Sequence, residues 1–159
     1  MNKRNKGFTL LELVTVISII TILVATGVPS FVNYQRHNAI KIASQDIKSF
    51  LTEARSLSLN PRPEDKGKEY YFVTIDSSTI SLKVNNTAKP IKAIEFGNDV
   101  EVKQGAGDYA FYIPSGEGRF DKKNIELRLK EEKSGEEVFR QTIIVDGIGG
   151  DVKVIEGNE

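Results

Sequence analysis

The stretch "KGFTLLELVTVISII", residues 6–20, decides the architecture of this chain because it sets one carboxylate inside an apolar run. The run covers residues 8–28, and a helix over these positions would span roughly 31 Å at about 1.5 Å per residue, the thickness of a hydrocarbon core. A carboxylate at the bilayer centre costs about 2.5–3.5 kcal/mol. The sequence therefore predicts a membrane segment in which Glu12 has a specific role.

The composition bounds the kinds of function that the chain can have. Its 159 residues provide one domain plus an appendage, and its 22 basic and 22 acidic residues cancel, so there is no overall attraction to nucleic acid or anionic lipid. The chain has no Cys and a single His, which excludes thiolate and multi-histidine metal sites within one chain. We interpret His37 as a solvent-facing helical residue and the acidic pair Glu136-Glu137 as a hairpin end. We therefore expect no metal, no cofactor and no enzyme activity.

Residues 1–7, "MNKRNKG", form a short basic leader, and two ordinary interpretations of it are open. A secretory signal peptide, cut near Ala25-Thr26-Gly27, has an apolar stretch of about 7–15 residues, which is shorter than this run, and Glu12 would weaken it. A plain transmembrane anchor explains the length of the run but leaves Glu12 without a role. In the anchored case, the basic residues before the run predict a cytoplasmic N-terminus.

The apolar pattern is interrupted at Gly27 and Pro29 and changes to that of an amphipathic helix over residues 29–60, and we expect one continuous helix from Phe8 to about Leu59. Apolar residues recur there at spacings of three and four, and polar residues fill the remaining positions. Asn60 precedes a proline, which pushes it out of the helical region and ends the helix. The apolar stripe consists of Ile40, Ala43, Ile47, Phe50, Leu51, Ala54 and Leu57.

Residues 61–159 carry the pattern of β-strands. In "TISLKV", residues 79–84, every second residue is apolar, and "IELRLK", residues 125–130, repeats this alternation. Further strand candidates are "YYFVTI", "YAFYI", "VFRQTIIV" and "DVKVIE". Short strands joined by hairpins favour antiparallel sheets covered by the amphipathic helix, which is an α+β fold. Turn residues between the strands are Asp76-Ser77-Ser78, Ser134-Gly135 and the run from Asp146 to Gly150.

The order Gly-Phe-Thr-Leu-Leu-Glu after a basic leader resembles the start of type IV pilins and pseudopilins. The resemblance implies that residues 1–7 are a prepilin leader, that a membrane peptidase cuts between Gly7 and Phe8, and that Phe8 is then N-methylated. It also supplies a partner for Glu12, because the amine freed at Phe8 of a neighbouring subunit can pair with this carboxylate in a low-dielectric filament core. Pro29 stands where many family members have a helix kink.

The same resemblance implies partners and a location. The partners are the prepilin peptidase and methyltransferase, other pilins or pseudopilins, an inner-membrane assembly platform, and membrane lipid before assembly. The implied location is the inner membrane, crossed once, with the N-terminus in the cytoplasm and the head domain outside it, followed by a place in a pilus or pseudopilus. The implied function is therefore structural, without catalysis.

Three stretches of the C-terminal part are similar to the minor pseudopilin H (GspH) of type II secretion and to the FimT minor pilins. "DIKSFLTEARSLSLN" resembles the end of the family's helical spine, with its Ala54-Arg55 pair. "YAFYIPSGEGRFDKKNIELRL" resembles a turn built on Phe111, Pro114 and Gly116. "QTIIVDGIGGDVKVIEG" resembles the closing hairpin, with Gly150 before the last strand. The resemblance implies a pilin-like fold and a minor subunit.

A DNA-uptake minor pilin that binds DNA through its head is the alternative function. Some FimT-like pilins end in a basic Gly-Arg-x-Arg hairpin that contacts DNA, whereas this chain has Gly150-Asp151-Val152-Lys153. Phosphate binding requires clustered Lys and Arg, but Asp146, Asp151 and Glu156 surround Lys153 in the sequence. The sequence therefore makes DNA a doubtful partner of this tip.

Overall fold

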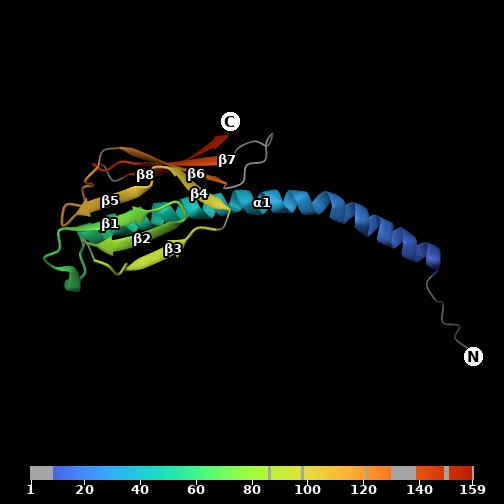
Figure 1. Ribbon diagram of the computed structural model, residues 1–159, viewed down its shortest axis with the longest axis horizontal. Coiled ribbons are helices and arrows are strands. Elements are labelled where there is room, and N and C mark those ends of the chain that lie inside the picture. The colour runs from blue at the N-terminus through green and yellow to red at the C-terminus, as the bar shows by residue number, and fades with distance from the viewer. Residues whose placement is uncertain are drawn as a thin grey trace, which may run out of the picture. The chain divides into compact units, whose positions relative to one another are not determined.

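The computed structural model describes residues 9–85, 87–97, 99–120, 122–129, 139–148 and 151–158 (Figure 1). By their contacts, the residues divide into two compact units, 1–35 and 36–159, and one helix contributes to both. We call the second the globular unit. In chain order the elements are α1 (Leu10–Leu59), the 3-10 helix η1 (Pro63–Asp65), β1 (Tyr70–Ile75), β2 (Thr79–Val84), β3 (Lys92–Glu95), β4 (Val100–Gln104), β5 (Gly107–Tyr112), β6 (Lys123–Leu129), β7 (Phe139–Val145) and β8 (Val152–Asn158).

Helix α1 is continuous from Leu10 to Leu59, as the sequence predicts, although the apolar pattern is interrupted at Gly27 and Pro29. A proline removes the hydrogen bond of its own N–H and disfavours the helical conformation of the residue before it, but the bonds on either side can still hold the helix together. A kink at Pro29 stays a prediction. The helix ends where the sequence predicts, since Asn60 N–H donates the last bond to Ser56 O at 3.0 Å and prolines follow.

The apolar stripe predicted for the helix is confirmed within the globular unit. Its members lie at spacings of three and four, so they share one face of the helix. Two serines, Ser44 and Ser58, are also buried, and their hydroxyls donate to Lys41 O at 2.8 Å and Arg55 O at 2.6 Å. Because each hydroxyl bonds within the helix, it enters the core without an unsatisfied polar group. The buried stripe residues are Ile40, Ala43, Ile47, Phe50, Leu51 and Ala54, and Leu57 is half-buried.

The strands form two antiparallel sheets of four strands each, ordered β3-β2-β1-β5 and β4-β6-β7-β8. We call them sheet A and sheet B. Every strand that the sequence suggested is present. Strands β3 and β4 were not predicted, for different reasons. In β3 only Ile94 is partly buried, so the strand has little alternation to detect, whereas β4 buries Val100 and Val102 but is only five residues long.

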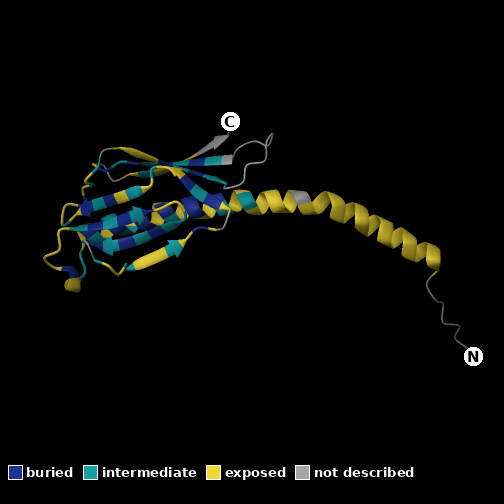
Figure 2. Cartoon of the chain, viewed as in Figure 1, coloured by how far each residue is buried: buried dark blue, intermediate teal, exposed yellow. Residues whose placement is uncertain are grey.

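The helix and both sheets share one hydrophobic core (Figure 2). The stripe of α1 belongs to the same cluster as Tyr71, Val73 and Ile75 of β1, which alternate with half-buried residues along that strand. Sheet B adds the buried side chains of Val100, Val102, Ile125, Leu127, Ile143 and Val145. The predicted α+β architecture, a long N-terminal helix with antiparallel sheets of pilin type, is therefore confirmed.

A buried hydrogen bond fastens the connection between the helix and β1. The Tyr71 side chain is fully buried, and its hydroxyl donates to Asp65 Oδ2 at 2.5 Å. The N–H of Arg62 in turn donates to the Tyr71 oxygen at 3.4 Å. Burial, reinforced by the bond to Asp65, raises the pKa of Tyr71 from 10.0 to about 12. The neutral phenol is therefore the form that the folded chain requires.

Tyr71→Phe should lower the free energy of unfolding of the globular unit by about 1–3 kcal/mol, because it leaves the Asp65 carboxylate buried without its donor. The parent should also lose stability as pH rises from 10 to about 12, since the unfolded chain releases the Tyr71 proton before the folded chain does. Tyr71→Phe should lose less over that window. Chemical unfolding of the full chain in micelles measures both effects. Tyr112→Phe, at an exposed tyrosine, is the control, and equal unfolding energies for the two variants would contradict the assignment.

Candidate functional site

The first turn of α1 holds the carboxylate that the sequence singles out. Thr9 N–H donates to Glu12 Oε2 at 2.9 Å, and the Thr9 hydroxyl donates to the same oxygen at 3.0 Å. The N–H of Glu12 in turn donates to Thr9 Oγ1 at 3.2 Å, and that of Leu13 donates to Thr9 O at 3.2 Å. Thr9 and Glu12 therefore form a reciprocal capping box, which satisfies backbone N–H groups that the helix start would otherwise leave open.

This cap is the functional feature that our sequence interpretation missed. The signal was present, because a Thr followed three residues later by a Glu, ahead of an apolar run, is the pattern of a capping box. The negative charge of Glu12 also lies in the first turn, where it complements the positive end of the helix dipole. Glu12 therefore stabilises the start of the helix within a single chain, without a partner from another subunit.

The apolar side chains that follow the cap are exposed (Figure 2). Residues 10–28 are all exposed, among them Leu10 at 80% and Leu23 at 64%. By length and composition, α1 can cross a membrane, and the apolar window that meets this test is not buried in the structure at all. Such a surface is stable in lipid or against other apolar helices rather than in water.

The hydroxyl groups in this apolar segment bond to the helix itself. Ser18 Oγ donates to Val14 O at 2.8 Å, and Thr21 Oγ1 donates to Ile17 O at 2.8 Å. Because these hydroxyls are satisfied by carbonyls one turn earlier, they can enter a hydrocarbon environment without an external partner. The same internal bonding is found at Thr15, Thr26 and Ser30.

The structure describes only some of the remaining predicted site residues. The predicted cleavage and methylation positions, Gly7 and Phe8, lie outside the described residues. Pro29 lies within the continuous helix. The acidic pair Glu136-Glu137 and the predicted turn Ser134-Gly135 also lie outside the described residues.

Two of the stretches that carry the resemblance to minor pilins meet at the end of α1. Gly116 has a positive φ of 71°, and a Cβ atom built on it would lie 2.7 Å from Leu59 Cδ2. Glycine suits this turn, because its backbone adopts the positive φ readily and it has no Cβ to displace the Leu59 side chain. Within the turn, Gly116 N–H donates to Tyr112 O at 2.8 Å, and the buried Phe111 ring meets Phe120 edge-on with 5.6 Å between centroids.

The hairpin between β7 and β8 carries acidic groups beside its lysine. Asp146 N–H donates to Asp151 O at 2.9 Å, which pairs these two residues across the hairpin. Asp146 Oδ1 also accepts the N–H of Ile148 at 3.0 Å. Lys153 is exposed on β8, two positions after Asp151, whereas Gly150 lies outside the described residues. Asp146 and Asp151 thus stand at the same end of the β7–β8 hairpin as Lys153.

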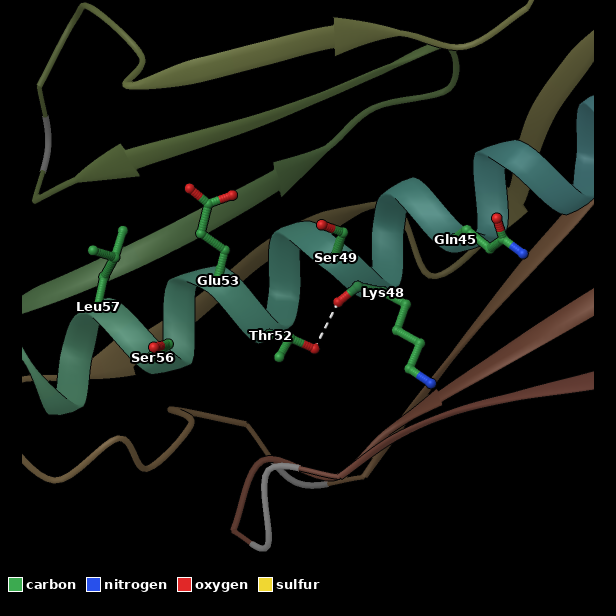
Figure 3. Close-up of a pocket in the computed structure, with 7 residues that line it drawn as sticks. All are labelled: Gln45, Lys48, Ser49, Thr52, Glu53, Ser56 and Leu57. Carbon is green, nitrogen blue, oxygen red and sulfur yellow. Dashed lines mark hydrogen bonds between the residues drawn. The ribbon is translucent and has the colours of Figure 1, made fainter.

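A shallow groove of about 510 Å³ lies along the polar side of α1 in the globular unit (Figure 3). Within the lining, Thr52 Oγ1 donates to Lys48 O at 2.8 Å, and Glu53 at its side pairs with Lys92 of β3 at 3.0 Å. The pair between Glu53 and Lys92 connects the helix to sheet A. Over the described residues, no group of three or more His, Asp and Glu side chains is placed to hold a metal ion. The groove is lined by Gln45, Lys48, Ser49, Thr52, Glu53, Ser56 and Leu57.

Comparisons with known proteins match the N-terminal segment to a family model and part of the chain to a known pilin. Residues 2–28 match a family model described as the prokaryotic N-terminal methylation motif. The chain carries the type IV pilin N-methylation motif. It is also similar to the type IV major pilin protein PilA of Myxococcus xanthus (strain DK1622), with 33% identity over 88 residues. The aligned part covers 55% of this chain and 40% of PilA, so it spans less than half of that protein.

These matches bear on the remaining expectations. One is to a processing motif and the other to a pilin, and neither is an enzyme family, in agreement with the expectation that the chain is not an enzyme. The named relative is a major pilin, so the finer similarity to GspH and FimT is not confirmed by it. No solved structure matches the chain.

Thr9→Ala should weaken the first turn of α1, because it removes the cap hydroxyl and one of the two donors to Glu12. Loss of such a cap typically costs about 0.5–2 kcal/mol. Amide hydrogen exchange of the chain in micelles, read by mass spectrometry over residues 10–13, should quicken accordingly. Ser18→Ala is the matched control, since its hydroxyl bonds further along the helix. Unchanged exchange over the first turn in Thr9→Ala would rule out the capping role.

Proposed function

We propose that this chain is a structural subunit of a type IV filament or a type II secretion pseudopilus. The observation that carries the proposal is a capped helix that starts next to the predicted cleavage position and leaves its apolar side chains exposed over residues 10–28. The methylation motif and the similarity to a type IV pilin support it. A surface of this kind serves first as a membrane anchor and then as the contact between sister helices in a filament.

In this proposal a prepilin peptidase removes residues 1–7 by cutting between Gly7 and Phe8, and Phe8 becomes N-methylated. Before assembly the subunit crosses the inner membrane once, with its basic leader in the cytoplasm and the globular unit outside it. An inner-membrane assembly platform then moves it into the filament beside other pilins or pseudopilins. Residues 8–28 supply the membrane and filament-core segment throughout.

Glu12 has a second role in the assembled filament. Both bonds from Thr9 go to Oε2, so the cap leaves Oε1 for another donor. The amine created at Phe8 of a neighbouring subunit is a cation of the right kind, and a pair formed in a low-dielectric core is costly to break by removing one partner. The cap and the pair can therefore exist together on the two oxygens of one carboxylate.

Within this class we assign the chain to the minor subunits, similar to GspH and FimT. The assignment is supported by the contact between the helix end and the turn at Gly116, because the two stretches that carry this similarity come together there. A DNA-uptake role is less well supported. Asp146 and Asp151 lie beside Lys153, and they would repel a phosphate backbone.

Processing is the first test of the proposal. The mature protein extracted from membranes should begin at Phe8 and carry one N-methyl group, as read by intact-mass and peptide mass spectrometry. Gly7→Leu, which alters the residue before the cut, should leave the leader attached in the same cells. A mature chain that begins at Val28 would show that the segment is a secretory signal peptide instead.

Assembly tests the pairing role of Glu12 separately from its capping role. Glu12→Gln keeps an oxygen that can accept the Thr9 bonds but removes the charge, so processing should persist while incorporation into filaments falls sharply. Removing one member of a buried ion pair typically costs about 3–5 kcal/mol. The measurement is the fraction of mature protein recovered with sheared filaments, relative to the fraction left in the membrane.

Thr9→Val is the matched control for this experiment, because it removes the hydroxyl of the cap and keeps the Glu12 charge. It should assemble far better than Glu12→Gln, provided that mass spectrometry shows normal processing of both. If Glu12→Gln assembles as well as the parent chain, the carboxylate does not make the proposed pair.

A further inference from the structure

A hollow of about 240 Å³ lies on the solvent face of sheet A, away from the residues discussed so far. Its walls are Tyr70 and Phe72 of β1, Asp108 and Ala110 of β5, and Arg119 from the loop that follows β5. Drug-sized ligands occupy sites of about 300–1,000 Å³, so this hollow is suited to a single ring. Two aromatic rings, one carboxylate and one guanidinium thus converge on a space of that size.

The strand register explains why the sheet is hollowed at this point. Across β1 and β5, Tyr70 lies opposite Tyr112, Phe72 opposite Ala110, and Thr74 opposite Asp108. These residues share the outer face, because the alternate residues of β1 point into the core. Ala110 has the smallest side chain among these facing residues, so the space that a longer side chain would fill stays open beside Phe72.

The walls of the hollow are held in place by bonds from neighbouring residues. The Thr74 hydroxyl donates to Asp108 Oδ1 at 2.7 Å, which fixes the carboxylate and leaves its second oxygen outside this bond. Arg119 N–H donates to Ala110 O at 2.8 Å, so the backbone of Arg119 is tied to β5. The rings of Tyr70 and Phe72 lie with their centroids 6.0 Å apart.

The β2 side of Phe72 is closed by a lysine. β1 lies between β2 and β5 in the sheet, and Lys83 of β2 pairs with Phe72 in the register. Its ammonium lies 5.9 Å from the centroid of the Phe72 ring, and this contact reaches the ring from β2, whereas the hollow opens toward β5. Phe72 is thus supported on one side and borders the open space on the other.

We propose that this hollow binds one ring of a neutral sugar polymer. The apolar C–H face of a pyranose packs on aromatic rings, and its hydroxyls both donate and accept hydrogen bonds. Asp108 supplies acceptor oxygens, and the guanidinium of Arg119 supplies donors in a planar fork. Aromatic walls combined with a few polar groups are the usual composition of a ligand site.

The charges of the lining favour a neutral ligand over a polyanion. The carboxylate of Asp108 and the guanidinium of Arg119 cancel within the hollow. A single-stranded nucleic acid would also stack on the aromatic rings, but it requires a groove with an excess of positive charge along its backbone. The inference concerns the globular unit and does not depend on how the N-terminal helix is processed.

Isothermal titration of the full chain tests the proposal. The chain is held in micelles of lauryldimethylamine oxide, since a detergent with a sugar headgroup would compete for the site. The probes are soluble oligomers of glucose, soluble oligomers of N-acetylglucosamine, and a short single-stranded oligodeoxynucleotide. At least one oligosaccharide should bind saturably, with a dissociation constant on the order of a millimolar for a single small ring. The two sugar series distinguish a plain hexose polymer from an amino-sugar polymer.

Two variants locate the binding. Phe72→Leu removes the ring and Arg119→Gln removes the guanidinium, and each should weaken binding roughly fivefold to tenfold. Phe72→Tyr keeps the ring and should bind like the parent, which preserves the test if Phe72→Leu fails to fold. Lys103→Gln, which removes an exposed cation on β4 of sheet B, is the matched control for Arg119→Gln and should have no effect.

The proposal is overturned if neither sugar series binds the parent chain, or if binding is the same in Phe72→Leu and Arg119→Gln as in the parent. It is also overturned if the oligodeoxynucleotide binds more tightly than both sugar series and its binding depends on the same two residues. That last result would assign the hollow to nucleic acid instead.

Discussion

Burial of one helical stripe is the constraint on which the globular unit depends. Ile47, Phe50 and Leu51 are almost completely removed from solvent, and a buried side chain of this size contributes about 1.5–3 kcal/mol relative to exposure. The same cluster includes side chains of sheet A and sheet B. Each sheet buries one apolar face in a core that the helix shares. The stripe thus packs against two separate sheets.

The sequence was most informative where a pattern repeats over many residues. The stripe of α1 and the alternation in β2 and β6 could be predicted because burial acts on every third, fourth or second residue. Strand β3 could not, since it has a single partly buried apolar side chain, and its place in the sheet comes from pairing with β2 rather than from its own composition. The continuity of the helix past Pro29 was also predicted, and the structure confirms it.

The candidate site shows the same division between local pattern and spatial arrangement. Glu12 stands out in the sequence as a charge in an apolar run, which predicts a partner outside the chain, whereas the capping signal of Thr9 three residues earlier is short and local. The structure shows that a partner inside the chain engages one of its oxygens. The hollow on sheet A could not have been predicted at all. It arises from the register between β1 and β5, which brings an alanine opposite Phe72 across strands far apart in the chain.

The internal bonding of the hydroxyls in α1 has a consequence for the proposed transfer of the helix from lipid to a filament. Ser18 and Thr21 donate to their own helix, so they need no hydrogen-bond partner from lipid or from a neighbouring helix. A helix of this kind can pass from one apolar environment to the other without breaking a polar contact. The difference in free energy between the two environments then rests on side-chain packing and on the single carboxylate. In the function proposed above, the pairing of Glu12 would therefore favour the filament without opposition from these hydroxyls.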